Sequence, residues 1–270
     1  MLSGLVIAPA SNIIVCCEFR IVDTCSHRDR KMYQDSNPYA VSQDMFAADA
    51  ALSERLGFLR KVYLHVFGAI LLLIGLEFLY FNTSAADSIM SLFGRRTWWI
   101  ALIGFMAVTW FAQSLAFSGA RPALQYLGLG LFTVAESIFT VPAIYIAIRV
   151  NPDLIGQAAF LTLVITGGLT LFVVVSKADF SFLRNALFVG GIAILGVGIL
   201  SAFGLFGGLQ TGTLISGAIV ALMCGYILYE TSQIMHHLPT TAHVAGALMI
   251  FGSIAQLFRH ILYLLLRFRD

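Results

Sequence analysis

The sequence predicts an all-α integral membrane protein, built as a bundle of seven transmembrane helices. Of its 270 residues, 59% are hydrophobic and only 11% are charged, whereas soluble domains carry about 25% charged residues. The mean hydropathy is +0.88. Apolar runs of about 20 residues, the length that crosses the hydrocarbon core of a bilayer, recur between residues 62 and 266. Because these runs are too long and too uniformly apolar for barrel strands, helices are favoured.

The first 58 residues differ from the rest of the chain. Residues 2–10 are apolar but too short to span a membrane, and no basic residue precedes them, so they make a poor signal peptide. A polar stretch follows, and a more ordinary sequence begins at Met32. Our hypothesis is that residues 1–31 are a mis-started or disordered extension. Residues 32–58 are predicted to form a polar cytoplasmic arm, and residues 59–270 the membrane domain.

Three of the apolar segments carry a glutamate, two of which lie in the first and third segments. Glu77 lies close to the end of the first segment, and we interpret it as a boundary residue. Glu136 lies in the middle of the third, so we expect it to face the bundle interior, protonated or paired. Pro142 is expected to kink that helix, because it removes a backbone hydrogen bond. The seven predicted segments are residues 62–81, 97–117, 123–148, 154–175, 187–205, 217–237 and 244–266.

The sixth segment holds the strongest candidate site. Gly217, Ala221 and Gly225 are spaced four residues apart, which predicts a flat stripe where a neighbouring helix packs closely. Glu230 follows, still inside the apolar run. A charged side chain at membrane depth costs about 2.5–3.5 kcal/mol on insertion scales, so it usually faces a partner or a water-filled cavity. The alternative is that Glu230 lies at the membrane boundary with its carboxylate among the headgroups.

The seventh segment carries a polar stripe. Ser253, Gln256 and His260 lie within about 60° of one another on a helix of 3.6 residues per turn. The stripe is interpreted either as part of an ion or proton path or as interhelical hydrogen bonding. Arg259 is expected to point elsewhere and to extend its guanidinium to the membrane boundary.

Several functional classes are disfavoured. The net charge of +2 is too small to indicate a nucleic-acid partner. The four cysteines form neither a disulfide framework nor a CxxC metal site. No metalloprotease, serine-hydrolase or phosphate-loop motif is present, so we expect no catalysis, cofactor or metal. Basic residues divide almost evenly between the two sets of connections, and the positive-inside rule only weakly favours a cytoplasmic amino terminus.

Ordered motifs occur at residues 157–162, residues 177–183 and residues 225–233, with a weaker one at 256–258 and 261–262. None is specific alone, but their order and spacing across residues 55–266 resemble the Bax inhibitor family, in particular its bacterial YccA-like branch.

The resemblance implies a seven-helix bundle with the last helix central, in the bacterial inner membrane. It also implies one of two activities, a pH-sensitive calcium leak or regulation of a membrane-embedded AAA protease. In leak-type members, two aspartates of the sixth and seventh helices share a proton and gate the path with an arginine of the second helix. Here Glu230 stands at the first aspartate position and Ser253 at the second, and residues 97–117 contain no arginine.

A carboxylate and a hydroxyl cannot make the shared-proton pair that two acids make. We therefore expect a non-enzymatic regulator of membrane-protein quality control. The alternative is a leak for calcium or protons that passes Glu230 and Glu136.

Overall fold

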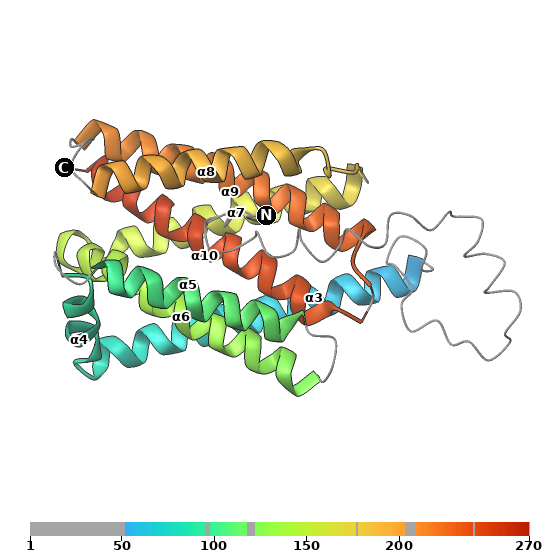
Figure 1. Cartoon of the computed structure of the whole chain (residues 1–270), viewed down its shortest axis with the longest axis horizontal. Helices are drawn as coiled ribbons and strands as arrows, with labels where there is room; N and C mark the ends of the chain where they lie inside the picture. The colour runs from blue at the N-terminus through green and yellow to red at the C-terminus, as the bar shows by residue number, and fades with distance from the viewer. Residues whose placement is uncertain are drawn as a thin grey trace, which may run out of the picture.

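The computed structural model describes residues 52–94, 98–117, 122–176, 178–202, 209–239 and 241–269, which form eight α-helices and no strand (Figure 1). Residues 1–31, the alternative start at Met32 and most of the predicted arm lie outside these ranges. The helices are α3 (Leu52–Asn82), α4 (Ala85–Leu92), α5 (Trp98–Ala116), α6 (Pro122–Val150), α7 (Asp153–Ser176), α8 (Leu183–Ala202), α9 (Leu209–His236) and α10 (His243–Arg267).

Six helices are long and apolar enough to cross a membrane: α3, α5, α6, α7, α9 and α10. They coincide with six of the seven predicted segments. The remaining segment is present as α8, but its apolar stretch, Leu183–Val197, is shorter. The fold is therefore an all-helical membrane bundle, as the composition predicts.

Two elements differ from the sequence-based expectation. Helix α3 begins at Leu52, so the last residues of the predicted arm are helical, and Phe58 is buried. Helix α4 was not expected. It follows Ser84, which has the left-handed φ of 55° that turns the chain out of α3, and it packs against α3, α5 and α6.

Helix α10 is the central element of the bundle. It packs against α3, α5, α6, α7 and α9, and Figure 1 shows it crossing between the pair α8–α9 and the pair α5–α6. Its polar residues Ser253 and Arg259 are buried together with its apolar ones, so α10 is enclosed on both its polar and its apolar sides. Val244, Ile250, Leu257 and Leu262 have no exposed surface.

The start of α3, the end of α7 and the turn between α9 and α10 lie at one end of the bundle. Phe58 and Val62 share an apolar cluster there with Val173, Met235 and Ala247. We call this the inner end, after the predicted cytoplasmic amino terminus. The carboxyl terminus lies at the opposite, outer end (Figure 1).

The predicted small-residue stripe on α9 is only partly a packing surface. Gly225 faces α8, and a Cβ added there would lie 2.7 Å from Leu187 Cδ2. The contact is reciprocal, because Gly190 of α8 approaches Leu222 of α9 in the same way. Ala221, however, is exposed, and a Cβ added to Gly217 meets nothing within 4 Å among the described residues. The four-residue spacing correctly identified a row of small residues, but it did not predict which side of α9 faces the neighbouring helix.

Candidate functional site

Glu230 of α9 lies in the interior of the bundle and accepts a hydrogen bond from α10. Its side chain has no exposed surface, and Ser253 Oγ donates to Glu230 Oε2 at 2.7 Å. Thr231 and Ser232, the next residues of α9, are also fully buried. Glu230 is therefore an interior residue rather than a boundary residue. The structure brings it together with Ser253, the first member of the polar stripe predicted on α10.

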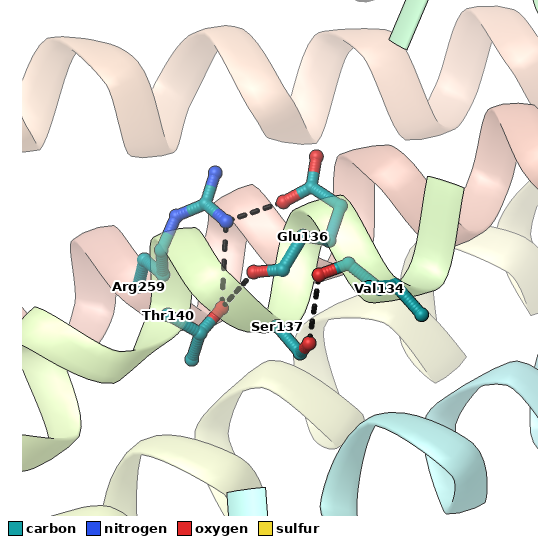
Figure 2. Close-up of polar contacts among 5 residues, drawn as sticks. All are labelled: Val134, Glu136, Ser137, Thr140 and Arg259. Carbon is teal, nitrogen blue, oxygen red and sulfur yellow. Dashed lines mark hydrogen bonds and ion pairs between the residues drawn. The ribbon is translucent and has the colours of Figure 1, made fainter. Parts of the chain in front are cut away.

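Glu136 of α6 also lies in the interior, where it pairs with Arg259 of α10 (Figure 2). Arg259 Nη1 donates to Glu136 Oε2 and also reaches Thr140 Oγ1 at 3.5 Å. The Thr140 hydroxyl donates to the backbone oxygen of Glu136 at 2.8 Å, one turn earlier on α6. The guanidinium is thus held by one carboxylate and one hydroxyl of the same helix turn.

This pair corrects the expectation for Arg259. Its side chain is 10% exposed, so it does not extend to the membrane boundary. The reason is the position of Glu136, since a buried carboxylate on the facing helix offers a guanidinium a stronger interaction than a distant headgroup. A signal was present in the sequence. Arg259 lies two turns before Arg267, too deep in the apolar run for a boundary residue.

Glu77 of α3 is the second correction. It is 6% exposed rather than at the boundary, and neither carboxylate oxygen has a hydrogen-bond partner among the described residues. The positive charge of Arg259 acts on Glu77 electrostatically. Arg259 therefore lies near two acids, and of these two it hydrogen-bonds to Glu136.

The other members of the α10 stripe are less enclosed. Gln256 and His260 are partly buried. The His260 ring lies 6.0 Å from the ring of Tyr263, and its Nδ1 is buried without a hydrogen-bond partner among the described residues. The stripe is thus divided. Ser253 meets Glu230, and Arg259, which the stripe did not include, pairs with Glu136.

At the inner end, the connection between α7 and α8 is hydrogen-bonded to α9. Ser232 Oγ donates to Asp179 Oδ1 at 3.4 Å, and Gln233 Nε2 donates to Ser181 Oγ at 3.2 Å. Gln233 of α9 therefore contacts this connection. The Ser181 hydroxyl also donates to Asp179 Oδ1, and this hydrogen bond lowers the pKa of Asp179 below its ordinary value of 3.8.

Acids and histidines do not gather into a metal site in the described part of the chain, where no group of three or more such side chains is placed to hold an ion. The buried acids instead lie singly on three helices, α3, α6 and α9, that all pack against α10. Each of these acids is therefore a separate buried carboxyl group rather than part of one cluster.

The family model "Inhibitor of apoptosis-promoting Bax1" matches residues 55–270. The chain belongs to this family. The match covers seven of the eight described helices completely and most of α3, and it confirms the resemblance drawn from the ordered motifs.

Similar proteins come from bacteria, animals and fungi. Protein lifeguard 4 of Mus musculus is 32% identical over 221 residues, which cover 80% of this chain and 87% of that protein. Bax inhibitor 1 of Schizosaccharomyces pombe is 28% identical over 229 residues, covering 81% and 79%. An uncharacterized membrane protein of Vibrio cholerae is 31% identical over 121 residues, covering 45% and 53%. The family and the six apolar helices identify an integral membrane protein.

Proposed function

We propose that this Bax inhibitor family protein is a cation or proton leak that uses the acids along α10. One observation carries the proposal. Among the described residues, three buried side chains are carboxyls, Glu77, Glu136 and Glu230, and Arg259 supplies the one buried guanidinium. The acids therefore outnumber the base three to one inside the bundle.

This imbalance has a chemical consequence. An uncompensated ion inside a protein is opposed by a desolvation free energy of several kcal/mol, even after relaxation. The excess carboxyls are stable in the bundle when each holds a proton or lies beside a mobile cation. A bundle that must take up protons or cations to balance its interior has the chemistry of a leak.

Glu230 is the residue at which we place the exchange. Glu136 is paired with the guanidinium of Arg259. Ser253, in contrast, donates its hydrogen bond to a carboxylate without adding charge, so Glu230 is able to gain and lose a proton or cation. Because Ser253 does not titrate, the response to pH follows one proton rather than the two of a paired-acid site.

Flux into liposomes containing the purified protein tests the proposal. We expect calcium or proton entry that varies between about pH 5 and 8, the range in which functional acids are commonly tuned. Glu230→Gln should reduce it at least about tenfold, because an amide cannot exchange a proton or balance a cation. Asp153→Asn, which removes an exposed acid at the start of α7, is the matched control. Equal flux through the parent and Glu230→Gln would contradict the proposal.

Regulation of a membrane-embedded AAA protease in the bacterial inner membrane is a second proposal. The observation that favours it is Phe182, an aromatic side chain that is 75% exposed at the inner end, beside the hydrogen-bonded turn at Asp179 and Ser181. An ordered turn presenting an aromatic side chain suits protein docking. Glu230→Gln separates the two proposals, since it should stop flux and leave protease binding intact.

We also propose that α8 is the seventh span. Its support is the reciprocal packing of Leu187 and Gly190 of α8 against Leu222 and Gly225 of α9. With seven spans the chain crosses from the inner end, where α3 begins, to the outer end, where α10 ends.

A further inference from the structure

A cleft lies between α3 and α7. The backbones of these two helices do not approach each other closely among the described residues, although each helix packs against α10. The space between them measures about 890 Å³, within the range of about 300–1,000 Å³ that small-molecule pockets occupy. Phe251 and Phe258 of α10 form its floor. At its inner end the cleft is bridged by a hydrogen bond from Tyr63 to Thr170 Oγ1 at 3.1 Å.

The cleft opens sideways, toward the lipid rather than toward water. Phe78 of α3 and Leu163 of α7 line it and are both 73% exposed on the outer surface of the bundle. Large apolar side chains on a membrane helix face hydrocarbon. A molecule dissolved in the membrane therefore has direct access to the cleft.

Glu77 is the acidic residue in this mostly apolar lining. The other polar residues that line the cleft are neutral: Tyr63, Asn82, Thr140, Thr162, Thr166 and Thr170. Glu77 lines the cleft and is only 6% exposed. Neither of its carboxylate oxygens has a hydrogen-bond partner among the described residues. A buried polar group that lacks a partner is strongly disfavoured. Arg259, the nearby cation, donates its hydrogen bonds to Glu136 and Thr140. Glu77 is thus a hydrogen-bond acceptor at the cleft for which the described part of the protein provides no donor.

We propose that the cleft between α3 and α7 binds a single-chain amphiphile with a primary ammonium head, which donates to Glu77 while its alkyl chain lies along α10. An ammonium group has three donors and no acceptor, which complements a carboxylate. Phosphate headgroups carry the same sign of charge as Glu77 and are disfavoured. Tyr63 and Glu77 are separated by about 21 Å along α3 at about 1.5 Å per residue, which leaves room for a long alkyl chain.

Glu77 is one of the three buried acids counted for the proposed leak, but the amine site does not include the position at which we place the exchange. The leak is placed at Glu230, on the α9 side of α10, whereas Glu230 and Ser253 do not line the cleft. Amine binding is therefore measured without reference to ion flux, and either proposal can fail while the other holds.

Equilibrium binding of dodecylamine to the full chain in phosphatidylcholine nanodiscs tests the inference, with dodecanol as the uncharged probe. We expect one saturable dodecylamine site per chain, with at least about tenfold preference over dodecanol, as a charge-assisted hydrogen bond provides. Glu77→Gln should remove the preference. Asp87→Asn, which changes an acid on α4 outside the cleft, should keep it.

A second variant tests the place of binding. Gly167 lines the cleft, and a Cβ added there meets nothing within 4 Å. Gly167→Leu should fill the cleft, preserve the fold and reduce dodecylamine binding at least about tenfold while retaining Glu77. If Glu77→Gln does not fold, Gly167→Leu still tests the inference. Equal binding of amine and alcohol by the parent, a preference that survives Glu77→Gln, or unchanged binding to Gly167→Leu would overturn the inference.

Discussion

Helix α10 contacts two buried glutamates of neighbouring helices through chemically different side chains. Near its inner half, Ser253 offers the Glu230 carboxyl a neutral hydroxyl. Two turns farther out, Arg259 offers Glu136 a full positive charge. A guanidinium offers a carboxylate an opposite charge, whereas a hydroxyl donates a hydrogen bond without adding charge. The comparison teaches that two buried acids of one bundle have chemically different partners, and our proposal places the exchange at the acid whose α10 partner is neutral.

Arg259→Met should break the outer site and have the largest effect on stability. It leaves Glu136 buried without its cation, and removing one partner of a buried pair costs about 3–5 kcal/mol. We expect a clear fall in melting temperature in detergent. Adding Glu136→Gln to Arg259→Met should recover most of this loss, because no uncompensated charge remains. If the double variant were as unstable as the single one, the pair would not be the source of the effect.

Ser253→Asp should sharpen the comparison by giving the inner site a second acid. Two carboxyls in contact titrate together, so the pH response of liposome flux should steepen from about one proton to about two. Ser253→Ala is the matched control, since it removes the hydroxyl without adding an acid and should keep the single-proton response. A parent that already shows a two-proton response, or a Ser253→Asp variant with an unchanged one, would refute our interpretation of Glu230 and Ser253.

Ser181→Ala should produce the smallest effect, at a carboxylate outside the bundle interior. The Ser181 hydroxyl lowers the pKa of Asp179, followed in smaller measure by a backbone hydrogen bond and the charges of His237 and His236. A lowered folded-state pKa means that the stabilisation is present above the unfolded value and is lost as pH falls through the folded value. Ser181→Ala should move that loss to higher pH, by a small amount because solvent screens Asp179. Melting temperature measured from pH 3 to 7, with the Ser114→Ala variant of α5 as control, should detect it.

The sequence by itself determined the class of protein. Hydropathy over about 20 residues is a local property, so the long apolar helices could be located before any contact was known. The same reasoning predicted that Glu136 is interior, because a carboxylate in mid-span has no water to reach. The ordered motifs were sufficient to identify the family. The side-by-side position of Glu230 and Ser253 also followed from that resemblance.

Only the tertiary structure decided which polar groups meet. A periodicity of 3.6 residues groups side chains on one helix but does not say toward which neighbour that helix is turned. The pairing of Arg259 with Glu136, the exposure of Ala221 and the contact of Gln233 with Ser181 all depend on that rotation. The burial of Glu77 depends in addition on the separation of α3 from α7, which leaves the cleft. Helix crossing and spacing arise from packing among all the helices around α10, and no single segment of the sequence contains that information.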